Sequence, residues 1–220
     1  MIKLEYLTCS NDCYFDTNYY PTTATSVYFK YSCAVSSDFG YLGVVANNGG
    51  SADGIQSYVH FNGIEFMFGG DVGGVGSAIY PSDLMDVVEV EFNISGVTYN
   101  GSTISIPSGT SLTNNPMYIN CLRNGEWMGK GNYYRVKFYE GNTLAMDLVP
   151  CIDSNNTVCF YDEVGQSYIY PIGSGTPTAG PVIPSTTNLL YIGDSNVEAM
   201  YIGGQEVEKI YLGSDIVYSI

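Results

Sequence analysis

Apolar and polar residues alternate along most of the chain with a period of two, which is typical of β-strands with one buried face. The clearest run is 88–93, in which Val88, Val90 and Phe92 alternate with Glu89, Glu91 and Asn93. The valines around residue 88, with the strict alternation that follows, favour a strand preceded by a turn over a helix. Strand-like runs separated by turn residues cover 25–35, 41–46, 56–62, 64–70, 86–93, 96–100, 103–108, 116–124, 133–140, 143–150, 157–164 and 166–172.

Short strands at this regular spacing predict an all-β fold made of two antiparallel sheets packed face to face, a β-sandwich or jelly roll. The composition agrees, because the 220 residues include 26 Gly and 21 Tyr but few Lys, Arg and Glu, a balance that favours strands and turns. A chain of this length can form one large domain with a small appendage.

The last thirty residues repeat a ten-residue unit: LYIGDSNVEA, MYIGGQEVEK and IYLGSDIVYS. Each unit predicts a strand, a glycine-led turn and a second short strand, as in a small β-meander. A unit this short cannot bury its own apolar face, so the repeats must stack on one another, on the preceding domain or on another chain. We therefore expect an assembly element whose contact residues are Tyr191, Tyr201, Tyr211, Val197, Val207 and Val217. The alternative is that they form plain hairpins packed on their own domain.

A proline- and glycine-rich stretch at 173–188 interrupts the strand pattern, because Pro177, Pro181 and Pro184 cannot donate to a β-ladder. We expect a sandwich domain at 1–180, a Pro/Thr-rich connector at 181–189 and the three repeats at 190–220.

Both ends of the predicted sandwich carry residues of a known pattern. The segment 142–180 contains a D-x-V-P-C string, a Y-D pair and a G-x-G-T-x-x-x-G ending, formed by Asp147, Val149, Pro150, Cys151, Tyr161, Asp162, Gly173, Gly175, Thr176 and Gly180. It resembles the closing strands of the concanavalin A-like, laminin-G-like jelly rolls of phage and prophage structural proteins. The strings LEYL and YFDTNYYP, which start at Leu4 and Tyr14, resemble the opening strand of that family.

The string EVEKIYLGSDIVYS in the repeats resembles the carboxyl-terminal modules of virion proteins in tailed phages of gut bacteria, including the crAss-like phages. Together the two resemblances imply a virion structural protein, such as a head or tail fibre or a decoration subunit. They imply a jelly roll that binds a host-surface glycan or a neighbouring virion protein, and symmetric copies imply a homo-oligomer. An architectural subunit without a carbohydrate ligand is the alternative.

The charge narrows the range of partners. The chain has 22 acidic and 7 basic side chains, a net charge of −15, which disfavours nucleic acids and anionic lipid surfaces. Neutral sugars, calcium-bridged ligands and proteins remain as partners. Residues 1–12 contain no apolar run of the length that a secretory signal needs, and no later segment reaches membrane-spanning length. We therefore expect synthesis in the host cytoplasm, assembly into the virion and no membrane insertion.

In a reducing cytoplasm the cysteines are expected to be reduced thiols buried between strands, and to oxidise only if the protein later works outside a cell. A zinc site is disfavoured: Cys9 and Cys13 have an acceptable spacing, but His60 stands alone. We expect no cofactor. The six cysteines are Cys9, Cys13, Cys33, Cys121, Cys151 and Cys159.

The strongest candidate for ligand binding is Trp127, in the glycine-flanked loop NGEWMGKGN, because an exposed indole offers an apolar face to a sugar ring. Arg123, Asn124, Glu126 and Lys130 surround it with donors and acceptors. The alternative is that the indole folds back to cap the sandwich edge.

A weaker candidate is Asp71, which could ligate calcium with Asp53 or Asp38. Without the spacing of a calcium loop, these aspartates are better interpreted as solvated loop residues.

Enzymatic motifs are mostly missing from the sequence. Some jelly rolls of this shape hydrolyse glucans with an E-x-D-x-x-E strand, and the nearest string here is DVVEVE, in which Asp86, Glu89 and Glu91 do not reproduce that order. We interpret Glu89 and Glu91 as the solvated side of their strand and predict that the chain is not an enzyme. A glycan hydrolase is the less favoured alternative.

Overall fold

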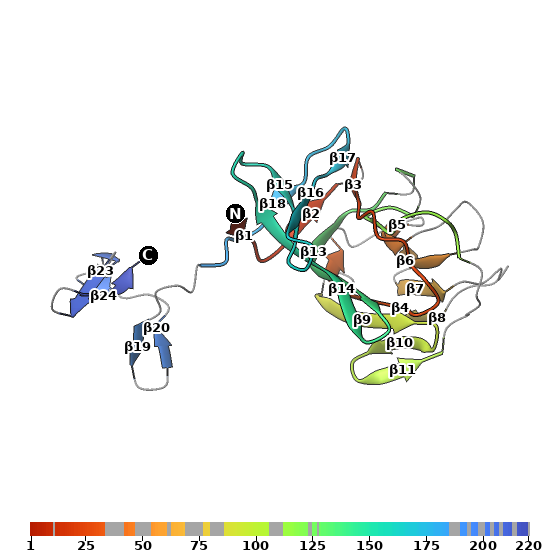
Figure 1. Cartoon of the computed structure of the whole chain (residues 1–220), viewed down its shortest axis with the longest axis horizontal. Helices are drawn as coiled ribbons and strands as arrows, with labels where there is room; N and C mark the ends of the chain where they lie inside the picture. Colours follow the sequence, from red (N-terminus) through yellow and green to blue (C-terminus); the bar gives the residue numbers. More distant parts are fainter. Residues whose placement is uncertain are drawn as a thin grey trace. The chain divides into compact units, whose positions relative to one another are not determined.

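The structure is a computed structural model that describes residues 1–10, 12–33, 42–46, 54–60, 63–68, 77–79, 86–105, 112–122, 125–126, 128–184 and the hairpin strands of the repeats between 190 and 219 (Figure 1). The chain forms two compact units, Met1–Val182 and Ile183–Ile220.

The first unit contains a large antiparallel sheet of 11 strands. Eight of them follow the order β11-β10-β9-β4-β13-β14-β15-β16, while β1 pairs with β14, and β2 pairs with both β13 and β18. Their bounds are β1 Ile2–Lys3, β2 Leu7–Cys9, β4 Thr25–Cys33, β9 Val88–Asn93, β10 Gly96–Tyr99, β11 Ser102–Ile104, β13 Gly131–Glu140, β14 Thr143–Ile152, β15 Val158–Asp162, β16 Ser167–Ile169 and β18 Thr178–Ala179.

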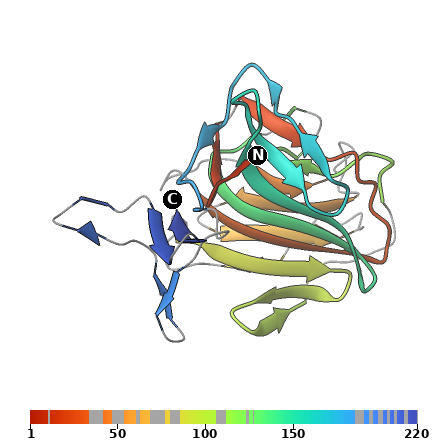
Figure 2. The same ribbon diagram turned by 60° about the vertical axis from the view of Figure 1, so that its left-hand side comes forward.

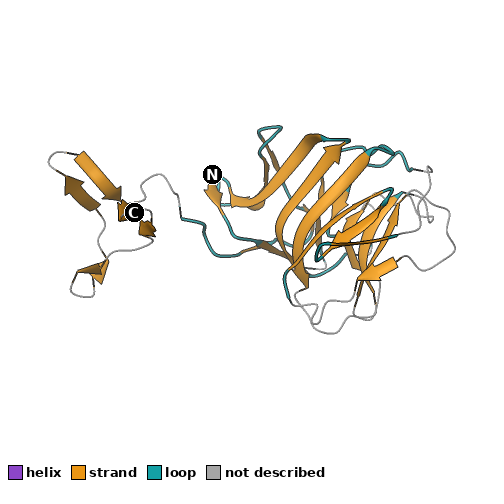
Figure 3. Ribbon diagram, turned by 90° about the horizontal axis from the view of Figure 1, so that it is seen from below, coloured by secondary structure: helices purple, strands orange, loops and turns teal. Residues whose placement is uncertain are grey.

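The second sheet has seven strands in the order β17-β3-β12-β5-β6-β7-β8. Figures 2 and 3 show the two sheets as the two layers of this unit. The strands are β3 Cys13–Asp16, β5 Leu42–Ala46, β6 Ile55–His60, β7 Gly63–Phe68, β8 Ser77–Ile79, β12 Tyr118–Ile119 and β17 Ile172–Gly173. The predicted all-β sandwich is therefore confirmed.

Apolar side chains of both sheets meet in one core. On β9 the predicted alternation is confirmed, since Val88, Val90 and Phe92 are buried while Glu89 and Glu91 are exposed. Contact between the layers is direct. The ring of Phe15 on β3 lies 4.8 Å, centroid to centroid, from that of Phe160 on β15, in an edge-to-face arrangement that aromatic pairs prefer.

The two ends of the first unit pair with each other. β18 adds to β2, β17 adds to β3, and an isolated bridge joins Leu4 to Val182. The backbones approach so closely that a Cβ at Gly173 would lie 2.2 Å from the Asp12 carbonyl oxygen, and one at Gly180 would lie 2.6 Å from that of Tyr6. The glycine-rich ending thus serves close strand pairing, and the proline-containing stretch continues the sandwich up to Val182.

One predicted strand is much shorter than expected. Of the described residues 116–122 in this run, only Tyr118–Ile119 form a strand, because Asn120 adopts a left-handed backbone with φ of 66°, which ends the extended conformation. The short strands β1, β2, β3 and β18 were not among the runs predicted from the alternation, and the predicted run 166–172 contains β16 and the first residue of β17.

Each C-terminal repeat forms its own two-stranded hairpin. The strands are β19 Leu190–Ile192 with β20 Ser195–Val197, β21 Tyr201–Ile202 with β22 Gln205–Glu206, and β23 Lys209–Leu212 with β24 Asp215–Ser219. Among the described residues of the repeats, strands pair only within a repeat. Each repeat thus contains the two short paired strands that its sequence predicts.

All six cysteines are buried free thiols. Within the segments that the structure describes, no helix has the length and hydrophobicity needed to cross a membrane.

Candidate binding site on the outer face of the large sheet

Polar side chains from three adjacent strands line up on the outer face of the large sheet. On β4, Tyr28 pairs in register with Glu91 of β9, and Glu91 in turn pairs with Thr98 of β10. Because directly opposed residues on one face lie about 5 Å apart, these side chains form a row across the sheet. Glu89 lies two residues before Glu91 on the same face of β9, and it pairs in register with Lys30 of β4.

The turn between β10 and β11 closes one side of this region. Asn100 and Gly101 have φ values of 49° and 75°, and such left-handed pairs are typical of the tight turns that suit the twist of a hairpin. The Asn100 side chain is exposed at the tip of the turn.

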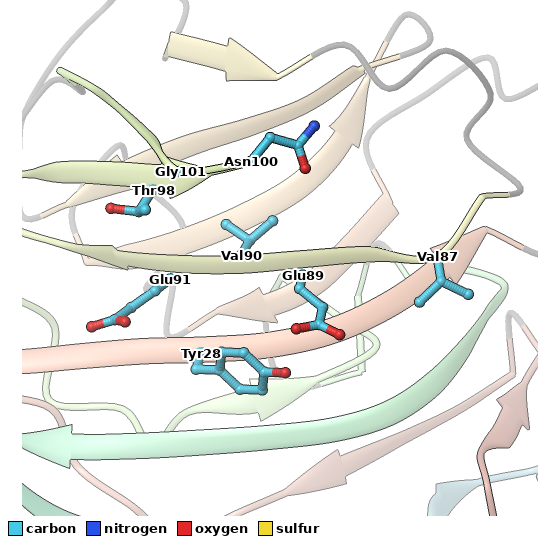
Figure 4. A pocket seen from close by; sticks show the side chains of 8 residues that line it. All are labelled: Tyr28, Val87, Glu89, Val90, Glu91, Thr98, Asn100 and Gly101. Atoms are coloured by element: carbon cyan, nitrogen blue, oxygen red, sulfur yellow. The ribbon is translucent and has the colours of Figure 1, made fainter.

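Together these elements form a shallow, open depression of about 490 Å³. Figure 4 shows the Glu89 carboxylate turned toward the Tyr28 hydroxyl, whereas the Glu91 carboxylate points away along the strand. The lining residues are Tyr28, Val87, Glu89, Val90, Glu91, Thr98, Asn100 and Gly101.

Both carboxylates in the depression have partners in the protein. Lys30 Nζ lies 2.8 Å from Glu89 Oε1, and Ser26 Oγ donates a hydrogen bond of 3.0 Å to Glu91 Oε1. The hydrogen bond from Lys30 holds the pKa of Glu89 below its ordinary value. Burial, followed by the charge of Glu89, raises the pKa of Tyr28 to about 12. At neutral pH the site therefore presents a carboxylate and a neutral phenol.

An ionic network continues from this site across β13 and β14. Arg135 makes two hydrogen bonds of 2.7 Å to the carboxylate of Asp147, and its Nη2 lies 3.3 Å from Glu163. Lys137 Nζ lies 3.6 Å from Asp147 and 5.8 Å from the ring centroid of Tyr28, which links the network to the depression. Asp147, the first residue of the D-x-V-P-C string, is therefore bound within the protein by Arg135 and Lys137.

Three of the five ligand-binding candidates around this loop lie outside the described residues, namely Arg123, Asn124 and Trp127. Glu126 is exposed, and its carbonyl accepts a hydrogen bond of 3.3 Å from the Leu122 amide. Lys130 is exposed, and its carbonyl accepts from the Tyr31 hydroxyl at 3.1 Å. The prediction that these residues bind a ligand stays a prediction.

The base of this loop is firmly anchored. The Asn120 amide donates to the carbonyls of Ser10, Cys13 and Gly129 at 2.9, 2.8 and 3.1 Å, while its oxygen accepts from the Tyr133 hydroxyl at 3.0 Å. A fully buried amide with this many partners fixes where the loop leaves the sheet.

The calcium candidates Asp71, Asp53 and Asp38 lie outside the described residues. Within the described part, no group of three or more His, Cys, Asp or Glu is placed to hold a metal ion.

Five of the six predicted assembly residues lie on the hairpins. Tyr191, Tyr201 and Tyr211 are on β19, β21 and β23, while Val197 and Val217 are on β20 and β24. Val207 is outside the described residues.

Sequence reasoning placed Glu89 and Glu91 on the exposed face of their strand but interpreted them as solvated residues, and it missed the residues that surround them. One available signal was the Asn100–Gly101 dipeptide between two strand-like runs, which indicates a hairpin and places Asn100 at its tip. Tyr28 has no comparable signal, because only the register between β4 and β9 brings it to this region.

The sequence was also compared with known proteins, and neither the protein-family models nor the curated proteins give a match.

Proposed function

We propose that this chain is a non-enzymatic structural subunit of a phage virion. In this proposal its β-sandwich binds a neutral glycan, and its hairpin repeats hold several copies together. Multiple copies would convert weak individual contacts into avid attachment to a cell surface. The virion assignment depends on the sequence resemblances, and the binding role is supported by the outer face of the large sheet.

The observation that carries the binding role is the chemistry of the depression. Thr98 and Asn100 are exposed there, beside the Tyr28 phenol and two carboxylates that already have protein partners. Hydroxyl, amide and carboxylate groups are complementary to the hydroxyl groups of a sugar, and a tyrosine ring offers an apolar surface. An open depression of about 490 Å³ has room for a short oligosaccharide.

The same geometry supports binding over hydrolysis. A glycosidase needs one carboxyl group that stays protonated near neutral pH, so the pKa of that group must be raised. Glu89 has the opposite shift, because Lys30 stabilises its charged form. The overall charge of −15 further favours an uncharged glycan over an acidic one.

A glycan array probed with the full-length chain tests the proposal. Asn100→Gly is the most informative variant, because glycine tolerates the φ of 49° and the change removes only the amide. We expect a signal for neutral glycans that falls at least tenfold in this variant and in Glu91→Gln. Loss in Trp127→Ala instead would place the ligand at the loop 123–130.

Two results would contradict the proposal. An array without signal, with the protein still incorporated into particles, would favour the purely architectural subunit. Release of reducing sugar that falls in Glu89→Gln or Glu91→Gln would show a hydrolase.

A further inference from the structure

Two cysteines face each other on the hairpin β14–β15. Cys151 and Cys159 are directly opposed in register, and their sulfur atoms lie 3.6 Å apart. Both are free thiols, and both side chains are fully buried.

The backbone around the pair already has the spacing of a disulfide. Asp153 N donates to Thr157 O at 3.0 Å, and Glu163 N donates to Asp147 O at 2.8 Å, so these flanking pairs are of the hydrogen-bonded type. Pairs of this type recur every two residues, which makes Cys151–Cys159 one of them, with an expected Cα separation of about 5.5 Å. Disulfides form across Cα separations of about 4.4–6.8 Å. The sulfurs therefore need to approach by only about 1.5 Å, through side-chain rotation.

We propose that Cys151 and Cys159 form a latent disulfide site that cross-links the hairpin β14–β15 when the protein meets a low-molecular-weight disulfide. This inference goes beyond the proposed function and does not depend on a glycan ligand.

The exchange balances with oxidised glutathione as the oxidant. The Cys151 thiolate attacks one sulfur of the glutathione disulfide, which releases one glutathione and leaves a mixed disulfide. Cys159 then loses its proton and attacks the Cys151 sulfur, which releases the second glutathione. Two cysteine S–H bonds and one glutathione S–S bond are broken, while one protein S–S bond and two glutathione S–H bonds form.

The surroundings favour Cys151 as the first nucleophile. A hydrogen bond from Cys159 lowers the pKa of Cys151, and the positively charged amino terminus acts in the same direction. The pKa of Cys159 is raised by the same hydrogen bond and by burial.

The other thiols have different partners. Cys33 donates to the Lys130 carbonyl at 3.6 Å, while Cys9 and Cys13 hydrogen-bond to each other from β2 and β3. Cys9 and Cys13 therefore form the competing pair that the experiment must distinguish.

Thiol mapping of the full chain tests the site. Reduced protein is exposed to oxidised glutathione, unfolded with N-ethylmaleimide and digested with trypsin. Residues 138–209 form one tryptic peptide, because no Lys or Arg lies between Lys137 and Lys209, and this peptide contains Cys151 and Cys159 alone among the cysteines. We expect it to lack both maleimide labels and to weigh about 2 Da less than its reduced form, since two hydrogens are lost.

A second experiment ensures that oxidised glutathione can reach the two thiols, which are buried in the folded protein. The same oxidation is carried out during refolding from urea, where both thiols are exposed to the reagent. The oxidised chain should then unfold at a higher urea concentration than the reduced chain, because a closed loop restricts the unfolded state. The Cys151→Ser, Cys159→Ser double variant should show no such difference.

The proposal is wrong if the peptide carries both labels after both treatments, or if Cys9 and Cys13 lose their labels instead. It is also wrong if the oxidised wild type unfolds at the same urea concentration as the reduced protein. A Cys9→Ser, Cys13→Ser double variant is the matched control and should keep the 2 Da loss in the 138–209 peptide.

Discussion

The ring of Tyr31 fills the space beside Gly131, so that a Cβ at residue 131 would lie 2.0 Å from Tyr31 Cε2. The Tyr31 ring also contacts the Tyr133 ring at a tilt of 58°, with ring centroids 5.0 Å apart, and the Tyr31 hydroxyl donates to the Lys130 carbonyl. Glycine is thus required where β13 begins, because an aromatic side chain of β4 crosses over its backbone.

Gly131→Ala should destabilise the protein by about 2–3 kcal/mol, because both the ring and the strand would have to shift. Urea unfolding measures the loss. In a Tyr31→Leu background the same substitution should cost less than about 1 kcal/mol, since the obstructing ring is gone. An equal cost in both backgrounds would show that the ring is not the obstacle.

Asn120→Asp should cost about 3 kcal/mol, because it turns a buried amide that donates to three carbonyls into an acceptor facing them. Asn18 is the matched control: it is exposed and has a similar left-handed φ of 53°, so Asn18→Asp should change the stability by less than about 0.5 kcal/mol. Chemical denaturation of both variants measures the two losses of stability. A large loss for Asn120→Asp alone would show that the buried hydrogen bonds, and not the left-handed backbone, cause it.

The pH dependence of Glu89 follows from its ion pair with Lys30. Its pKa in the folded protein is lowered, so its contribution to stability is present above the unfolded pKa of about 4.3 and is lost as the pH falls through the lowered folded value. An NMR titration of the side-chain carboxyl should give a midpoint below 4.3 in the wild type, and a normal one in Lys30→Met. A midpoint near 6 would instead indicate a general acid and revive the hydrolase alternative.

Removal of residues 186–220 should leave the sandwich folded, because Met1–Val182 is a compact unit of its own. The truncated chain should keep its melting temperature but have the mass of a monomer by light scattering, since the hairpins are proposed to hold the copies together. The triple variant Tyr191→Ala, Tyr201→Ala, Tyr211→Ala should weaken the oligomer at unchanged chain length. A truncated chain that still assembles would refute the assembly role of the repeats.

Strands with a strong local pattern could be predicted from the sequence, and strands formed only by distant pairing could not. β9 and β13 are long enough for alternation to show which face is buried. β17 and β18 have two residues each, and they become strands because the first and last parts of the unit meet. That meeting has no periodic signal in the sequence.

The candidate site shows the same limit. Glu89 and Glu91 could be placed on the exposed face because their own strand alternates, but nothing in that strand marks them as part of a site. Tyr28 and Thr98 are about 63 and 7 residues from Glu91 in the sequence, and only strand register places them beside it. Trp127 was chosen on local composition alone, which says nothing about the direction in which a loop side chain points.

The bridge between Leu4 and Val182 has a practical use. Since the sandwich begins and finishes on adjacent strands, its entry and exit points are separated by roughly the spacing of neighbouring strands, about 5 Å. The whole sandwich could therefore be inserted into a single surface loop of another protein. In a circularly permuted sandwich, only a short peptide would be needed to join the residues next to Leu4 and Val182.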